Sequence, residues 1–163
     1  MNFAGRKPKI VEALVPLFVS PNDQDNRELL REKAYLEIKD IEKYPDYMES
    51  VSSIEVLKRD EKSITARWNG SIDGAPLTWI QKNELLDDKQ EVHFEALEGD
   101  FEIFKGKWSI GSHKKNLLLQ LEIEYRLGIP VIEDVLGPIL SEKIKTNSIA
   151  MLEAIASRLN CNG

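Results

Sequence analysis

Cysteine, histidine and long apolar runs are all scarce in this chain of 163 residues. The sole cysteine is Cys161, and the two histidines are His93 and His113. A lone cysteine cannot form an internal disulfide, so a reducing compartment and a cytoplasmic location are expected. The histidines are far apart and show no metal-ligand spacing, so we expect no metal and no cofactor. No apolar run approaches the ~20 residues of a membrane span.

An excess of positive charge is also missing. The formal net charge is −6, and acidic and basic residues are interspersed. A nucleic-acid binder normally carries a basic stripe, whereas the short basic clusters at residues 6–9 and 113–115 fit a solvated surface. The sequence also lacks a Gly-x-Ser-x-Gly nucleophile elbow and a phosphate-binding glycine motif. Nucleic acid is therefore not an expected partner, and a serine nucleophile is unsupported.

The composition that remains is that of a globular protein. Hydrophobic residues make up 42% of the chain and charged residues 31%. The length suits one domain, residues 1–163, which buries enough surface to fold without a metal or a disulfide.

The hydrophobic pattern predicts one strand, a broken helix, six further strands and one long helix. The first strand covers residues 10–19, and a helical spacing over residues 29–41 is broken at 44–48, where Pro45 disfavours helix before it. From residue 51 to 127 the period switches to two, with tight turns between the segments. The last helix is entered near Val131 or at Pro138.

Strands with one apolar face each need something to cover that face, and only the helices are available. A sheet that curls around one helix leaves space between them, and ligand sites favour concave apolar enclosures. The prediction is therefore an α+β fold. It has a curved antiparallel seven-stranded sheet wrapped around the long C-terminal helix, with an internal cavity.

Aromatic side chains on the inward strand faces are candidates for the wall of this cavity. Flat rings would stack on a planar ligand, although ordinary core packing would give the same pattern. Met151 is either flexible pocket lining or plain core, and Asn147 either faces the cavity or bonds the local backbone. The predicted ligand-binding residues are Tyr44, Met48, Trp68, Trp79, Phe94, Phe104, Trp108, Asn147 and Met151.

Three polar side chains are candidates for catalysis: Tyr47, Gln81 and Asn83. Gln81 and Asn83 share the inward face of Trp79, and a buried amide without a partner costs roughly 1–3 kcal/mol. A polar ligand group, a water or the neighbouring backbone would satisfy these amides. The Tyr47 phenol either donates to a carbonyl or enolate oxygen or, together with Tyr44, plugs the cavity mouth.

Spaced tryptophans and glycines accompany an acidic segment. Residues 40–48 read Asp-Ile-Glu-Lys-Tyr-Pro-Asp-Tyr-Met, and Trp68-Asn69-Gly70, Trp79, Glu98-Gly99 and Gly106-Lys107-Trp108 follow. With these motifs, nearly the whole chain resembles the polyketide cyclase/dehydrase branch, which includes aromatase/cyclases, of the START/Bet v 1-like helix-grip superfamily.

The resemblance implies a cavity for a poly-β-ketone, a prenylated quinone or a similar apolar compound. Aromatase/cyclase members fold a bound polyketide, which then undergoes aldol closure and dehydration. An arginine often assists on the strand of the second tryptophan, whereas here Gln81, Lys82 and Asn83 follow Trp79.

Three functions follow as hypotheses. The first is a polyketide cyclase/aromatase-like enzyme acting on a hydrophobic intermediate, with an acyl carrier protein as a candidate partner. The second is a non-catalytic lipid or quinone carrier of the same fold, like the coenzyme Q-binding relatives. The third is an interaction module whose cavity is filled by side chains and whose acidic outer surface acts. Either a monomer or a homodimer fits the sequence.

Overall fold

The computed structural model describes residues 7–72, 74–128 and 130–161. Strands alternate with turns through the middle of the chain, and helices flank them. In chain order the elements are β1 (Lys9–Leu17), the 3-10 helix η2 (Pro21–Asn26), α1 (Arg27–Lys39), the 3-10 helix η3 (Ile41–Lys43), α2 (Tyr44–Tyr47), β2 (Val51–Arg59), β3 (Ser63–Ile72), β4 (Ala75–Leu86), β5 (Glu91–Gly99), β6 (Phe101–His113), β7 (Asn116–Leu127) and α3 (Pro130–Cys161).

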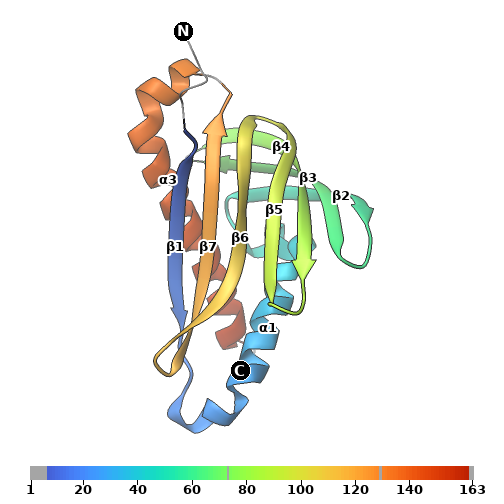
Figure 1. The fold of residues 1–163 in the computed structure, drawn as a ribbon, viewed down its shortest axis with the longest axis vertical. Helices are drawn as coiled ribbons and strands as arrows, with labels where there is room; N and C mark the ends of the chain where they lie inside the picture. Colours follow the sequence, from blue (N-terminus) through green and yellow to red (C-terminus); the bar gives the residue numbers. More distant parts are fainter. Residues whose placement is uncertain (1–6, 73, 129, 162–163) are drawn as a thin grey trace.

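The seven strands form one antiparallel sheet in the order β1-β7-β6-β5-β4-β3-β2. Strands β2 to β7 are a continuous meander, and β1 joins at β7, so β1 and β2 are the two edges. Figure 1 shows α3 behind β1 and β7, and α1 at and below the lower end of β5. Helix α1 contacts both β5 and β6. The predicted seven-stranded helix-grip arrangement is confirmed.

The first helix ends earlier than predicted, whereas the last helix begins beside Val131, one of its two predicted entries. The first helix ends at Lys39, before Pro45, and the non-helical backbone of Asp40 (φ −84°, ψ 67°) separates α1 from η3. Pro45 lies in the first turn of α2, where its missing N–H breaks no helical hydrogen bond. The last helix begins at Pro130, and Pro138 lies inside it.

The core lies between the concave face of the sheet and the helices. Alternate residues of β7 are buried, while the residues between them are half-buried, as the period of two predicts. The inward side of α3 completes this core. Buried side chains of β7 and α3 include those of Leu117, Leu119, Leu121, Ile123, Tyr125, Ile144, Ser148, Leu152, Ile155, Ala156 and Leu159.

Gly106 allows the middle of the sheet to pack closely. It is paired with Phe94 on β5 and with Ile123 on β7. A Cβ at Gly106 would overlap the carbonyl oxygen of Glu122 and lie 2.9 Å from Cζ of Phe94. Because the Glu122 oxygen belongs to the backbone of β7, it cannot rotate away.

We predict that Gly106→Ala lowers the free energy of unfolding by about 2 kcal/mol, because overpacking strains both the sheet and the Phe94 ring. Gly111→Ala on the same strand is the matched control. Its Cβ would meet the Gln120 side chain at 3.6 Å, an ordinary contact. The control should therefore change stability by less than about 0.5 kcal/mol. Urea unfolding of both variants tests the prediction, and equal losses would contradict it.

Candidate functional site

An unfilled chamber of about 70 Å³ lies between the concave face of the sheet and α3. Among the described residues its lining is aromatic and aliphatic, with a few uncharged polar side chains and no ionisable one. Eight of the predicted site residues line it: Trp68, Trp79, Gln81, Phe94, Phe104, Trp108, Asn147 and Met151.

The aromatic rings form a continuous wall from β3 to β6. Trp68 and Trp79 are paired across β3 and β4, and their rings stack with centroids 5.9 Å apart and planes at 17°. Trp79 lies 5.6 Å from Phe104, which stacks on Phe101 at 4.5 Å. This wall offers flat apolar faces to whatever enters the chamber.

Phe101 is a lining residue that the sequence pattern did not reveal. Strict alternation would place Phe101 and Phe104 on opposite faces, because they are three residues apart. A register shift between Phe101 and Ile103 in the pairing of β6 with β7 brings both rings to the chamber. Such a bulge changes which face the following residues occupy, and no local signal in the sequence marks it.

The chamber adjoins an open groove of about 400 Å³ beside α2 and α3. Tyr47 and Met48 line this groove and not the chamber. Four residues line both spaces and so form the wall between them: Ser50, Ser71, Asn147 and Met151. We call these four residues the partition. Within it, the Asn147 Nδ2 lies 3.8 Å from the Met151 Sδ, one helical turn along α3.

Gln81 and Asn83 form a relay with Trp79. The Trp79 indole N–H donates to Oε1 of Gln81 at 2.8 Å, and Nε2 of Gln81 donates to Oδ1 of Asn83 at 2.8 Å. An indole N–H can only donate, so it fixes the orientation of both amides. Gln81 lines the chamber, while Asn83 is buried and is not among the lining residues. The polar patch expected from the sequence is thus largely occupied by bonds within the protein.

Tyr44 lies in the core and does not line the chamber. Its ring is fully buried, and its hydroxyl donates to the backbone carbonyl of Ile38. The rings of Tyr47, Trp68 and Trp108 surround it, with centroids 6.1, 5.9 and 5.9 Å away. Tyr44 therefore holds α2 against the aromatic wall.

Tyr47 combines a buried hydroxyl with a charged neighbourhood. Its Oη has no hydrogen-bond partner among the residues that the structure describes. The Arg158 guanidinium lies 4.4 Å from the ring centroid, and Nε of Arg158 bonds Glu37 at 2.8 Å. Burial and then the charge of Glu37 raise the pKa of Tyr47, and Arg158 only partly opposes this. The phenol therefore stays protonated at neutral pH and can donate a hydrogen bond.

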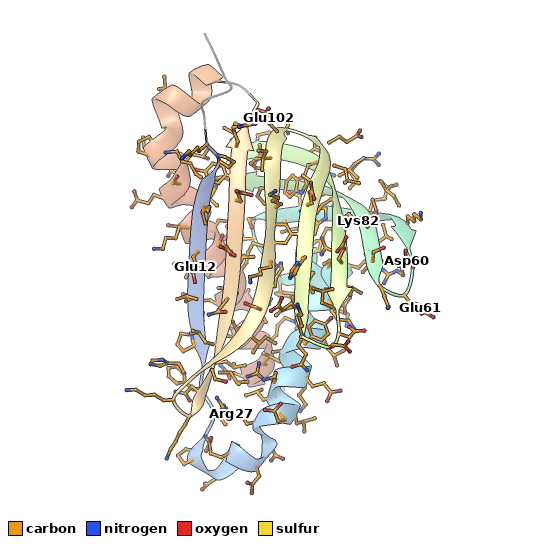
Figure 2. All side chains as sticks on the ribbon, in the orientation of Figure 1. Glu12, Arg27, Asp60, Glu61, Lys82 and Glu102 are labelled. Carbon is orange, nitrogen blue, oxygen red and sulfur yellow. The ribbon has the colours of Figure 1, made fainter. Side chains whose placement is uncertain are left out.

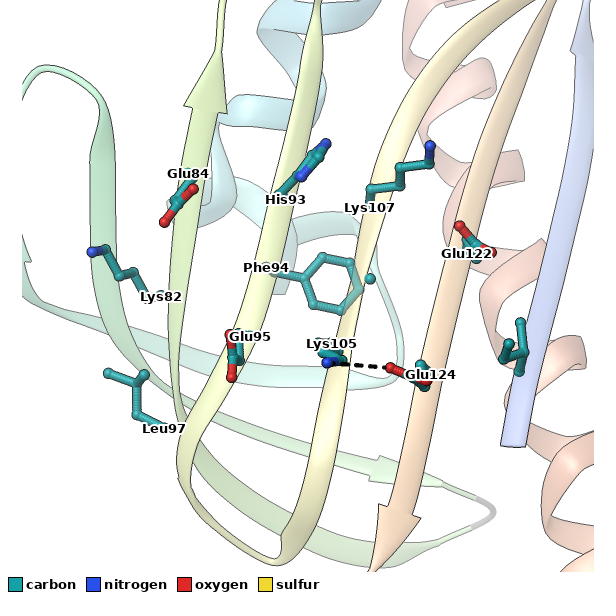
Figure 3. A pocket seen from close by; sticks show the side chains of 12 residues that line it. Lys82, Glu84, His93, Phe94, Glu95, Leu97, Lys105, Lys107, Glu122 and Glu124 are labelled. Atoms are coloured by element: carbon teal, nitrogen blue, oxygen red, sulfur yellow. Dashed lines mark ion pairs between the residues drawn. The ribbon is translucent and has the colours of Figure 1, made fainter. Parts of the chain in front are cut away.

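The outer face of the sheet carries a different kind of hollow, about 490 Å³ in volume (Figure 3). Charged side chains cover this face, as Glu12 and Lys82 illustrate in Figure 2. One row of paired residues across β4 to β7 alternates in sign: Lys82, Glu95, Lys105 and Glu124. Nζ of Lys105 lies 3.4 Å from Glu124. Because charged side chains line the outer hollow, it suits an apolar ligand less than the chamber does.

No helix in the described ranges is long and apolar enough to cross a membrane. The same residues contain no group of three or more His, Cys, Asp or Glu side chains placed to hold a metal ion.

Solved structures with the same fold include bacterial proteins of several kinds. A protein from Thermus thermophilus aligns at TM-score 0.81 and 22% identity, over 95% of this chain and 99% of its own. The Zhui aromatase/cyclase from Streptomyces sp. R1128 aligns at 0.75 and 16%, over 94% of each chain. A START superfamily protein from Mycobacterium smegmatis aligns at 0.74 and 18%, over 94% and 99%. At these identities the likeness establishes the fold.

A search of curated proteins finds no match. The family model described as "Polyketide cyclase / dehydrase and lipid transport" matches residues 31–152. This match includes α2, every strand of the meander and the part of α3 that lines the chamber. The chain therefore belongs to the polyketide cyclase/dehydrase and lipid transport family.

Proposed function

We propose that the chamber and the groove together bind a hydrophobic poly-β-ketone or aromatic intermediate, and that the protein promotes its cyclisation and dehydration. The observation that carries this proposal is an aromatic chamber that the side chains do not fill. Family membership supports a ligand of this class, and the aromatase/cyclase relative shares the fold. An unfilled interior also argues against an interaction module whose core is closed by side chains.

The size of the chamber requires the partition to move when a ligand binds. An apolar cavity of ~150 Å³ holds benzene, and typical ligand sites enclose ~300–1,000 Å³. The chamber has about 70 Å³ and the groove about 400 Å³. Met151 has a flexible, unbranched side chain, and its contact with Asn147 is long, so a change of rotamer can join the two spaces.

Orientation is the main catalytic contribution that this site can make. In an aldol closure, a methylene carbon between two carbonyls forms a bond to a distant carbonyl carbon, and its proton ends on the new hydroxyl. Subsequent loss of water completes the dehydration. Holding the two carbons in contact replaces an improbable encounter of chain segments with a favourable geometry. The site's catalytic donor in this proposal is the protonated Tyr47 hydroxyl, which has no partner among the described residues and belongs to a residue that lines the groove; it would stabilise an enolate or alkoxide oxygen.

Gln81 and Asn83 have a supporting part in this proposal. Gln81 reaches the chamber, and Asn83 holds its amide in place. An acyl carrier protein is the partner we propose for delivery of the chain to the groove.

A non-catalytic carrier of a lipid or quinone is the second candidate function. One observation favours it: no ionisable side chain of the described part of the chain lines the chamber, so none of these residues offers a general base beside a ligand there. The same partition and aromatic wall would let a carrier bind and release its ligand without converting it chemically.

We predict that Met151→Ala raises the affinity for the three-ring ketone anthrone, because the shorter side chain opens the partition. A gain of about threefold or more is expected, corresponding to removal of part of a conformational cost. Quenching of tryptophan fluorescence measures it. Leu36→Ala, at an exposed position on α1, is the control and should bind anthrone like the wild type. Weaker binding by Met151→Ala would contradict a partition that limits entry.

We predict that the protein changes the ratio of products formed from a reactive poly-β-ketone supplied by a minimal synthase. Tyr47→Phe should lower the yield of the cyclised, dehydrated product about tenfold or more, because a donor to the developing oxyanion is lost. Tyr125→Phe removes a hydroxyl that contacts Ser141 away from the groove, and should keep the wild-type ratio. Chromatography of the products measures both. An unchanged ratio with the wild-type protein would exclude the enzyme and leave the carrier.

A further inference from the structure

We infer that the indole N–H of Trp68 binds an oxygen atom of the ligand inside the chamber. This inference rests on the proposed function, since it assigns a role within the same site. Trp68 lies on β3, is 4% exposed and lines the chamber. Its Nε1 is buried and has no acceptor among the described residues. Buried donors are almost always satisfied, so an unsatisfied one in a binding chamber calls for a specific explanation.

The neighbouring Trp79 provides a comparison, because its indole N–H does have an acceptor within the protein. Trp79 is the cross-strand partner of Trp68 and stacks on it nearly parallel. The Trp79 N–H has an acceptor in Gln81, and the relay continues to Asn83. Two stacked indoles therefore share one wall, yet of the two donors only that of Trp79 has an acceptor in the described part of the protein. The Trp68 donor is left for an acceptor that arrives with the ligand.

The position of this donor narrows the class of ligand. Three uncharged polar residues of the partition line both the chamber and the groove: Ser50, Ser71 and Asn147. Trp68, in contrast, lines the chamber and does not line the groove. A molecule that enters through the partition must therefore present an acceptor oxygen on the part that reaches the aromatic wall. A ketone, an enol or a quinone carbonyl on a flat skeleton satisfies this requirement, whereas the hydrocarbon tail of a lipid does not.

A matched pair of probes tests the inference: 1-tetralone, and tetralin, which has the same carbon skeleton without the carbonyl oxygen. Dissociation constants of both are measured by calorimetry for the wild type and for Trp68→Phe, which keeps an aromatic ring and removes the N–H. We expect the substitution to weaken 1-tetralone binding about fivefold to tenfold, the usual worth of one hydrogen bond. Tetralin should lose only the smaller share of affinity that comes from contact with the larger indole ring, because it makes no such bond.

The outcomes separate the two proposals. If neither probe binds the wild-type protein, the proposed function fails and the inference fails with it. If both probes bind and Trp68→Phe alters them equally or not at all, the chamber is a binding site but the indole is not its oxygen donor. Comparing each probe between the wild type and Trp68→Phe cancels the hydration of that probe, so the two changes in affinity can be set against each other.

A measurement on the wild-type protein keeps the test independent of how Trp68→Phe folds. The chain has three tryptophans, so nitrogen-15 labelling gives three indole N–H signals. Trp79→Phe and Trp108→Phe assign these signals by elimination. Addition of 1-tetralone should move the Trp68 signal downfield, as a new hydrogen bond does, and tetralin should not. A Trp68 signal that responds identically to both probes would overturn the inference.

Discussion

The structure depends on one constraint, which is that a curved sheet must bury its apolar concave face with few helices. Seven strands contribute inward side chains, while α3 and the short α1 and α2 segments supply the cover. One helix covers a strip of the sheet and cannot fill the whole concavity. The aromatic rings of β3 to β6 occupy most of the remaining space, and the chamber is what they leave.

The apolar interior makes each polar atom within it informative. Tyr44 gives its hydroxyl to the Ile38 carbonyl, and Trp79 gives its N–H to Gln81. The donors of Tyr47 and Trp68 have no such acceptor in the described chain, and the two residues line the groove and the chamber respectively. Because an unsatisfied buried donor lowers stability, its presence on both sides of the partition fits a site that is completed by an oxygen-bearing ligand.

The volumes of the chamber and the groove bear on how a ligand would enter the site. The chamber alone is smaller than a cavity that holds one benzene ring, so a flat polycyclic ligand needs the groove as well. Asn147 and Met151 on α3, together with Ser50 and Ser71 from the sheet side, decide whether the two spaces are one. Under the proposed function, a ligand that moves Met151 would gain access to the aromatic wall, and its size would be limited by how far the partition opens.

The sequence by itself determined the strand alternation, the seven-stranded sheet, the inward tryptophans and the family, because period and motif are local properties. Only the tertiary structure decided that Phe101 joins the wall, since a bulge in the pairing of β6 with β7 reverses its face. It also placed Tyr44 in the core, and it put Met48 in the groove and Gln81 in a closed relay. These outcomes depend on contacts between distant segments. Volume and hydrogen-bond satisfaction arise only when the sheet and α3 come together.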